Sequence, residues 1–540
     1  MPRLPVAERP ETPERTTSST SPVNPTALSR SPFLDRSNLL RSPGLWLSIA
    51  AGAFGFFNLF LFPNLPIWTG GDQAIILEDA KRMLNGEALY GDFFQMTFPA
   101  TQLYYLSLFK LFGPRTWIPN LTLGVLGVAL ALLIYLVSTR ILPPRYAVLP
   151  ALIWLTLIFH EKLDATHHWF AILAVLSALV VLLECRTPRR IFAAGTLCGL
   201  AACFTQSHGV AALLAFGLFL FLQEKTHQDS SQSFTRNCAF LLAGFSLPVV
   251  LIVGPFLLQA GWSRFVYCTF IFLFKYYHAF QVANDWHGYL ISQVPLLHSG
   301  HVWRLGAFML VHALVPLIYV LMLVRHSRSA FRNDSVLRSR LLLISLLGLF
   351  LFFGVASTPT WSRLYYISSP ALVLFVWWVN GTGKVGQPVL TGLYAATFLL
   401  LIGFPIAKQV RSHHVLDLPG GRTAFLNAEQ FERYRWVAEH THPGNYFFGG
   451  FYPDFYFLLG LNNPAKVPFI TPDDYTRPRD VADAMEGLEI HHVGLVIWQN
   501  ALDLPPIPAA DHLGPLRAYL HQHYRLVKNS SEYEAWARTE

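Results

Sequence analysis

The chain has 540 residues, of which 53% are hydrophobic, 14% aromatic and only 13% charged, and its mean hydropathy is +0.38. This composition is far too apolar for a water-soluble enzyme and predicts an integral membrane protein. The formal net charge of +8 could suggest a nucleic-acid partner, but the basic residues lie at the edges of apolar segments, where membrane topology explains them, so we expect no nucleic-acid binding.

Residues 1–43 are rich in Pro, Ser, Thr and Arg and are predicted to form a disordered cytoplasmic tail. Apolar segments of helical length then recur along residues 44–407, and a helix needs about 20 residues to cross a hydrocarbon core of about 30 Å. The sequence therefore predicts an α-helical polytopic membrane protein with about eleven transmembrane helices. The predicted spans are residues 45–62, 120–137, 146–159, 169–183, 191–204, 209–222, 238–258, 302–324, 341–355, 364–379 and 390–406.

The distribution of Lys and Arg predicts the orientation, because short cytoplasmic connections retain positive charge. If the N-terminus is cytoplasmic, the inside connections hold most of these residues, including Arg140, Arg186 and Arg325. An odd number of spans then places the C-terminal region on the outer side of the membrane. A bacterial-type inner membrane is the expected location.

The first outward loop, residues 64–116, contains an unusual number of carboxylates for so apolar a chain. Its segment QAIILEDAKRML, residues 73–84, has the spacing of an amphipathic helix, with a charged group opposite the apolar face that suits the membrane interface. Asp72 precedes this helix and follows a Gly-Gly pair. It could be an ordinary N-cap or a functional carboxylate.

Three further outward connections contain polar side chains next to apolar spans. The segment HEKLDATHHWF contains Asp164 and His168, and TPTWSRLYYISSP contains Arg363 with Tyr365 and Tyr366; the sets could line a site, or could lie in solvent or anchor the membrane edge. The region from Trp262 onward mixes aromatic residues with cations, and it could form a wall for a sugar or an interfacial anchor. The cations, histidines and carboxylate of this region are Arg264, Lys275, His278, Asp285 and His287.

The Cys and His patterns do not indicate a metal ligand set. The five cysteines show no CxxC spacing and are expected to be packing residues. His167 and His168 are adjacent, which should point their side chains to different faces of a helix. A need for a divalent metal is therefore not indicated.

From residue 408 to residue 540 the apolar runs shorten and Asp, Asn, His and Pro become common. The segment RDVADAMEGLEI is predicted to form an amphipathic helix, and HVGLVIW is predicted to form the buried strand that follows it. This alternation predicts a small α/β extracytoplasmic domain, which could bind an acceptor or cap the bundle.

The first outward loop resembles that of the membrane-embedded glycosyltransferases of the GT-C type, in particular the protein mannosyltransferase (family 39) and lipid A aminoarabinose transferase superfamily. The resemblance is specific over roughly fifty residues and diffuse elsewhere. Gln73 departs from the Glu that is common in the family, and Ala100 interrupts a Pro-Pro pair. The matching positions are Asp72, Gly86, Leu89, Tyr90, Asp92, Pro99, Tyr104, Tyr105 and the closing Leu111, Phe112 and Gly113.

The resemblance implies transfer of a sugar from a polyprenyl-phosphate donor to an acceptor hydroxyl on a lipid, glycan or protein, with inversion at the anomeric carbon. Phosphate is a good leaving group, so one carboxylate to take the acceptor proton and cations to hold the phosphate would suffice. Asp72 is the expected base, and Asp164 corresponds to the family's second carboxylate. The expected substrate-binding residues are Asp92, Glu78, Arg363, Tyr365, Tyr366, His168 and Gln206, the last standing where relatives often have Lys or Arg.

Two other classes of function stay open at this point. A lipid or sugar transporter would also have many spans, but it would usually show internal repeats, and we see none. A non-catalytic binding protein on the same fold is the other alternative, since a fold does not determine activity.

Overall fold

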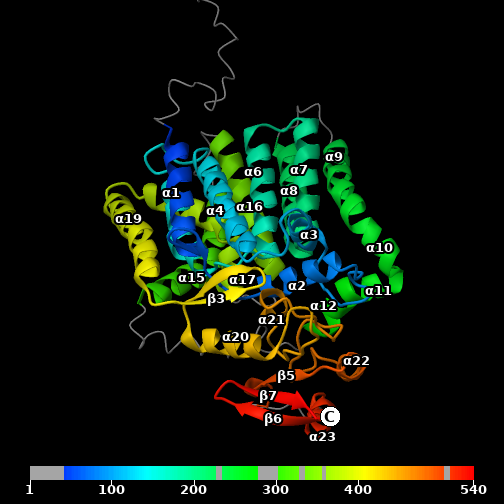
Figure 1. Ribbon diagram of the computed structural model, residues 1–540. Helices are drawn as coiled ribbons and strands as arrows, with labels where there is room; N and C mark the ends of the chain where they lie inside the picture. The colour runs from blue at the N-terminus through cyan, green and yellow to red at the C-terminus, as the bar shows by residue number, and fades with distance from the viewer. Residues whose placement is uncertain are drawn as a thin grey trace, which may run out of the picture.

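The computed structural model describes residues 42–226, 234–277, 302–327, 335–355, 361–503 and 511–539. Almost all of the predicted tail, and the predicted contributions of His278, Asp285 and His287, lie outside these ranges. The described chain forms a bundle of helices with a smaller mixed domain at one end, and α1 (Pro43–Leu59) begins at the opposite end (Figure 1).

Seven helices among the described residues are long and apolar enough to cross a membrane. Three shorter apolar helices accompany them, namely α1, the broken helix Leu149–Glu161 that begins with α5 (Leu149–Ile153), and α18 (Ser369–Asn380). A membrane-spanning helical fold is thus confirmed, whereas the exact count of eleven is not. The seven are α4 (Trp117–Ser138), α6 (His167–Glu184), α8 (Gln206–Thr226), α9 (Phe234–Pro248) continuing into α10 (Gly254–Ala260), α15 (Val302–Ser327), α16 (Ser335–Val355) and α19 (Gly386–Val410).

Helix α7 (Pro188–Phe204) packs so closely against α9 that the backbones of the two helices are in contact. A Cβ added to Gly195 would lie 2.2 Å from the carbonyl oxygen of Leu241, and one added to Gly199 would lie 2.1 Å from that of Phe245. Small residues spaced four apart allow such close approach in membranes, where dispersion contacts replace the hydrophobic effect as the source of helix association. The two glycines therefore fix how this helix pair packs.

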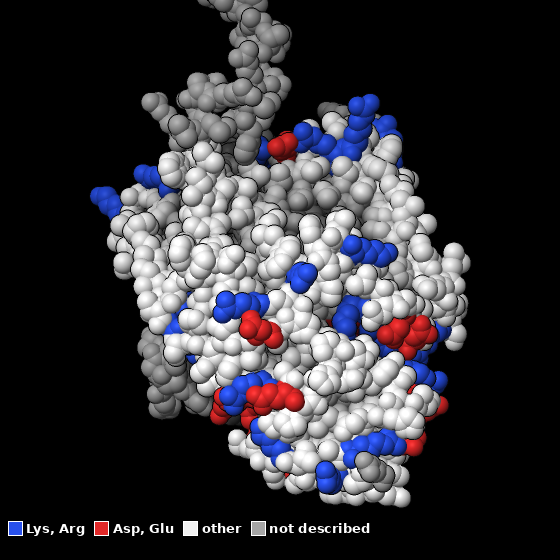
Figure 2. Space-filling model, in the orientation of Figure 1, with Lys and Arg blue, Asp and Glu red and all other residues white. Residues whose placement is uncertain are grey.

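Charged side chains gather at the end of the bundle where α1 begins and over the mixed domain, with few between them (Figure 2). At the end of α6 opposite His167, Glu184 pairs with Arg140 at 2.8 Å and with Arg190 at 2.5 Å. Exposed pairs of this kind stabilise a protein by less than about 1 kcal/mol each. Their position at a helix end matches a membrane–water boundary.

Between the bundle and the mixed domain lie α2 (Gln73–Leu84) and α3 (Ala100–Phe112). The predicted helix at 73–84 is present, but its charged face does not meet solvent. Glu78, Asp79, Lys81 and Arg82 are each less than 10% exposed. The interfacial interpretation is wrong for this face because the mixed domain covers it: Lys81 Nζ donates to the carbonyl of Tyr456 at 3.0 Å.

The mixed domain begins with the hairpin β3 (His414–Leu418) and β4 (Gly421–Phe425), followed by α20 (Ala428–His440) and α21 (Asp454–Leu458). Helix α22 (Pro478–Ile490) leads into the buried strand β5 (Leu495–Gln499), at the predicted position. An antiparallel sheet in the order β5-β7-β6 completes the domain, with α23 (Gly514–His523) before β6 (Tyr524–Asn529) and β7 (Tyr533–Arg538).

The start of the first loop is tied to both parts of the protein. The short hairpin of β1 (Phe60–Leu61) and β2 (Leu65–Pro66) leads into Trp68. The backbone N–H of Trp68 donates to the carbonyl of Ala424 in β4 at 2.9 Å. Asn120 Nδ2 of α4 donates to the carbonyl of Ile67 at 2.9 Å. These bonds hold the segment that precedes Asp72 in a defined position.

Candidate active site

Asp72 lies at the first residue position before α2, at the end of the bundle that faces the mixed domain. Its backbone is helical (φ −61°, ψ −20°) and its side chain makes no capping hydrogen bond. A capping Asp would have extended backbone and would accept from an N–H of the first turn. The residue is exposed, so its carboxylate is available to a ligand.

The Gly-Gly pair before Asp72 brings the backbone against Asp164. Gly71 has φ +80°, and a Cβ on it would lie 3.3 Å from Oδ2 of Asp164. Only glycine adopts this conformation without strain, and the contact leaves little space for a side chain. The two predicted carboxylates are therefore brought together by the local conformation of this turn.

Side chains from three helices hold Asp164 and the backbone of Ala165. The N–H of Ala165 donates to Oε1 of Gln73 at 3.0 Å, and the hydroxyl of Tyr105 donates to the carbonyl of Ala165 at 2.9 Å. The hydroxyl of Tyr366 donates to Oδ1 of Asp164 at 3.1 Å. Gln73 thus uses both ends of its amide, because its Nε2 also donates to Thr69.

Asp164 is buried, at 7% exposure. Burial raises its pKa; the charge of Lys162 opposes the change, and the negative charge of Asp72 raises the pKa further. Two carboxylates that influence each other in this way favour states in which one is neutral. Asp72 is the more exposed of the two, so its carboxylate is the one that a ligand can reach.

Three histidines extend the site along α6 and α8. The rings of His167 and His168 lie 4.1 Å apart, and that of His168 lies 5.3 Å from His208. The expectation that the adjacent pair points to different faces is therefore wrong, since both rings lie in one cluster at the first turn of α6. Nδ1 of His167, Nδ1 of His168 and Nε2 of His208 are buried and make no hydrogen bond within the described protein.

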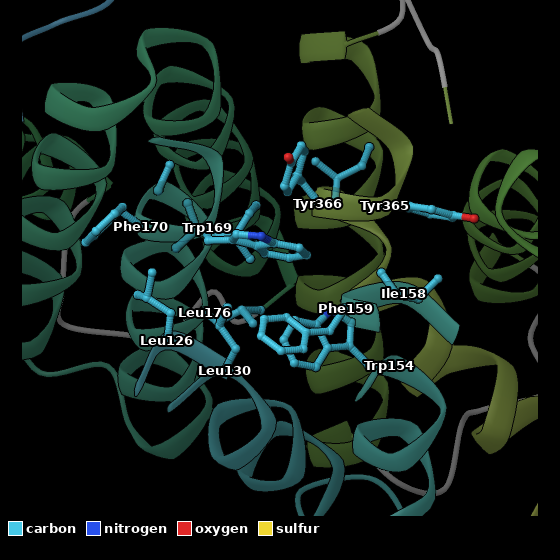
Figure 3. Packing of buried hydrophobic residues seen from close by; sticks show 14 of the residues in the cluster. Leu126, Leu130, Trp154, Ile158, Phe159, Trp169, Phe170, Leu176, Tyr365 and Tyr366 are labelled. Carbon is cyan, nitrogen blue, oxygen red and sulfur yellow. The ribbon is translucent and has the colours of Figure 1, made fainter. Parts of the chain in front are cut away.

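A layer of aromatic rings supports this cluster. His168 stacks on Tyr366 at 4.4 Å, and Trp169 meets the edge of Tyr366 at 4.5 Å. In Figure 3 Trp169 lies between Tyr366 on one side and Phe159 and Trp154 on the other. The layer fixes the position of the Tyr366 hydroxyl that contacts Asp164.

Arg363 of α17 (Trp361–Ile367) supplies a positive charge next to the histidines. It donates to the hydroxyl of Tyr277 and lies 5.5 Å from the centre of that ring. Its charge acts on His167 and His208, and Asp72 interacts electrostatically with His167 and Tyr277. The cation and the two carboxylates therefore lie around one region.

The mixed domain contributes Tyr475 to the same region. Its ring lies 6.2 Å from that of Tyr277 and is influenced by the charge of Asp72. The site consequently includes residues more than 400 positions apart in the sequence. It lies between the bundle and the mixed domain rather than within either one.

The other predicted residues lie elsewhere. Glu78 pairs with Lys81 at 3.2 Å against the mixed domain, and Asp92 Oδ2 accepts from the N–H of Ala88 at 2.7 Å in a turn. Gln206 Nε2 donates to the carbonyl of Met96 at 2.9 Å. Tyr365 points away from Tyr366 into the bundle (Figure 3).

The structure brings together Asp72, Asp164, Arg363, Tyr366 and His168 among the predicted residues. The sequence analysis missed Tyr277 and Tyr475, because no motif around either residue marks it as functional. It also did not select His167 and His208. The concentration of His and Tyr at the ends of the spans that face the mixed domain could have indicated His167 and His208. Among the described residues, no three His, Cys, Asp or Glu side chains gather as a metal-binding group.

This arrangement combines an exposed carboxylate, a second carboxylate with raised pKa, one guanidinium and buried imidazole nitrogens without partners. A carboxylate of this kind can accept a proton from a hydroxyl group. Arginine and imidazole N–H groups can hold a phosphate.

Comparison with solved structures finds the same fold in two membrane glycosyltransferases. ArnT from Cupriavidus metallidurans bound to undecaprenyl phosphate matches with a TM-score of 0.54 at 14% identity, over 92% of this chain and 97% of that chain. In its apo state ArnT matches with a TM-score of 0.51, again over 97% of its chain. The oligosaccharyltransferase of Archaeoglobus fulgidus matches with a TM-score of 0.50 at 12% identity, over 92% of this chain and 73% of that chain.

These matches show that the chain has the GT-C fold, as the resemblance of its first loop predicted. No family model matches the sequence. No curated protein matches it either.

Proposed function

We propose that the protein is a membrane glycosyltransferase that moves a sugar from a polyprenyl-phosphate donor to an acceptor hydroxyl on the outer face of a bacterial-type inner membrane. The observation that carries the proposal is the meeting of Asp72 and Asp164 with Arg363 and the histidine cluster. The GT-C fold, and the undecaprenyl phosphate bound to the similar protein ArnT, support a lipid-linked donor.

In the proposed reaction Asp72 accepts the proton of the acceptor hydroxyl as its oxygen attacks the anomeric carbon. The bond between that carbon and the phosphate oxygen breaks, and the electron pair leaves with polyprenyl phosphate. A single in-line displacement of this kind inverts the anomeric centre. No acid catalyst is needed because the leaving phosphate is already stable as an anion.

Arg363 and the imidazole N–H groups bind the phosphate and stabilise the charge that develops on it. Asp164, with its raised pKa and its hydrogen bond from Tyr366, is suited to accept from and donate to sugar hydroxyls. The transferred group is a hexose or a pentose, and the acceptor is a lipid, a glycan or a protein.

The test is sugar transfer by the purified full chain in lipid nanodiscs, with a panel of radiolabelled polyprenyl-phosphate sugars and a mixed acceptor extract. Consumption of one donor with formation of a labelled product supports the proposal. Donor binding without consumption across the panel overturns it and favours a binding protein. Movement of intact donor across sealed vesicles, measured in parallel, would instead identify a transporter.

A further inference from the structure

The side chain of Gln73 lies between the segment that contains Asp72 and the segment that contains Asp164. Gln73 is the first residue of α2 and is 1% exposed, whereas Asp72, its neighbour in the chain, is exposed. Its amide oxygen accepts from the N–H of Ala165 at 3.0 Å, and its amide nitrogen donates to the hydroxyl oxygen of Thr69 at 2.8 Å. One buried amide therefore joins two segments that are remote in sequence.

Contacts with the Asp164 segment flank Asp72 on both sides. On one side, a Cβ on Gly71 would lie 3.3 Å from Oδ2 of Asp164. On the other side, Gln73 holds the N–H of Ala165. The side chain of Asp72 makes no capping hydrogen bond. The two flanking contacts therefore determine where the backbone of Asp72 lies relative to Asp164.

The peptide group that Gln73 binds is buried. Ala165 is 0% exposed, and its carbonyl accepts from the hydroxyl of Tyr105 at 2.9 Å. At the start of the same segment, Nε1 of Trp169 donates to the carbonyl of Lys162 at 3.2 Å. Without Gln73, the N–H of Ala165 would be a buried donor without its partner, which is costly. The segment would then have to move, and Asp164 would move with it.

The amide of Gln73 makes these bonds without adding a charge. Asp72 and Asp164 already interact unfavourably, since the negative charge of Asp72 contributes to the raised pKa of Asp164. A Glu at this position could make similar contacts, because the hydroxyl of Thr69 can rotate and donate to it. It would, however, place a third carboxylate beside the other two, and like charges favour the protonated forms of such groups.

We propose that Gln73 is a positioning residue, whose neutral amide holds Asp72 at a fixed place relative to Asp164 without bringing a third negative charge beside them. The inference rests on the proposed sugar transfer, in which Asp72 is the base. Gln73 itself is buried beneath the site and acts only through the two carboxylates.

Other titratable and charged groups surround the two carboxylates, in addition to Tyr105. The tyrosines ordinarily ionise near pH 10, whereas a histidine can titrate near neutral pH. All of these groups are the same in the wild type and in variants of Gln73, so a difference between their pH profiles reports the change at Gln73. The groups are Lys162, His167, Tyr277, Arg363, Tyr366 and Tyr475.

The experiment measures kcat and the donor KM for sugar transfer by the full chain in nanodiscs, between about pH 5 and about pH 9. Gln73→Met has a similar size and removes both hydrogen bonds, so kcat should fall at least roughly tenfold at every pH, with the donor KM within about twofold of the wild type. Gln73→Glu should approach the wild-type kcat at the alkaline end, while the acid limb of its profile moves up by about one pH unit.

The matched control is Gln522→Glu, which adds the same charge at an exposed position on α23. Its profile should match that of the wild type. A purely structural role for Gln73 would lower kcat in both of its variants without moving the acid limb. If Gln73→Met does not fold, Gln73→Glu still decides the question, because it retains the shape of the side chain.

A second measurement does not need sugar transfer. Modification of Asp72 by a water-soluble carbodiimide, quantified by mass spectrometry of its peptide over the same pH range, follows the protonation of this carboxyl. It should move to higher pH in Gln73→Glu and not in Gln522→Glu. Absence of transfer by the wild type would contradict the proposed function and leave this measurement to test Gln73. Wild-type kcat in Gln73→Met, or unchanged profiles in Gln73→Glu, would overturn the inference.

Discussion

The hydroxyl of Tyr366 donates to Oδ1 of Asp164 across 3.1 Å, and the same ring stacks on His168 at 4.4 Å. One residue of α17 thus connects a buried carboxyl to the histidine cluster. Because the ring and the hydroxyl make separate contacts, the two can be tested separately.

Tyr366→Phe retains the ring and removes only the hydrogen bond to Asp164. A hydrogen bond between neutral groups contributes about 0.5 to 1.5 kcal/mol, so we expect kcat for sugar transfer to fall roughly twofold to tenfold with little change in thermal stability. The measurement is steady-state transfer in nanodiscs. Tyr394→Phe, which removes a hydroxyl contact from α19 to the carbonyl of Arg145 in the turn before α5, is the control. Unchanged kcat in Tyr366→Phe would contradict a role for Asp164 in the site.

Arg363 is expected to bind the donor phosphate. Arg363→Gln should raise the KM for the donor roughly tenfold to a hundredfold, and Arg363→Lys should recover only part of this, because lysine lacks the planar fork that binds two phosphate oxygens. The readout is the KM for the donor at saturating acceptor. Arg190→Lys, at the opposite end of the bundle, should leave it unchanged. Full recovery by lysine would show that charge alone is needed.

The pair of Lys81 and Glu78 is expected to hold the mixed domain on α2. Lys81→Met leaves Glu78 as an uncompensated buried charge and removes donors to two carbonyls of the mixed domain, which should destabilise the protein by about 3 to 5 kcal/mol. The measurements are the melting temperature and the rate of proteolysis of residues 411–539. Arg435→Met, in an exposed pair on α20, should change neither. If Lys81→Met melts like the wild type, this contact does not hold the domain.

Asp79 should make stability depend on pH. It accepts from Gln95 and Gln102 in a buried position, and burial raises its pKa from the ordinary 3.8 to about 7. The folded chain binds this proton more tightly than the unfolded chain, so the contribution of Asp79 is fully present below pH 3.8 and is lost as the pH rises through about 7, a change on the order of 4 kcal/mol.

Asp79→Asn should remove this dependence. We expect its melting temperature to fall less than that of the wild type between pH 5 and about pH 8, since the amide cannot ionise. Melting curves of both proteins at matched ionic strength test this. Parallel curves would show that Asp79 is already ionised throughout this range.

The sequence predicted the membrane-spanning part of the fold well where apolar runs are long. The predicted spans at 120–137 and 169–183 correspond to α4 and α6, which extend each run by two to three residues at its N-terminal end and by one at its C-terminal end. Hydropathy succeeds there because a helix is the form in which a lipid-exposed segment satisfies its own backbone groups. It could not show that the charged face of α2 is buried, because the covering domain is remote in sequence.

Prediction of the site was limited in the same way, because residues remote in sequence meet there. Asp72 and Asp164 lie beside spans, so their position at the membrane edge marks them as candidates in the sequence alone. Tertiary packing brings Tyr277 to Arg363 and Tyr475 to Tyr277. Such contacts produce no periodic pattern in the sequence, so they could not be predicted from it. Glu78 and Asp92 have the right residue type at the right membrane edge, but the structure places them in local contacts.

Whether Asp72 is the base is tested by comparing sugar transfer by the wild type and by Asp72→Asn in the same nanodiscs, with donor binding measured on both. Loss of a general base typically lowers a rate by a factor of about 10² to 10⁴. We expect transfer by Asp72→Asn to fall by at least about a hundredfold with donor binding retained. Asp417→Asn, in an exposed pair on β3, should transfer sugar at the wild-type rate. An Asp72→Asn protein that transfers sugar within a few-fold of the wild-type rate would show that Asp72 is not the base.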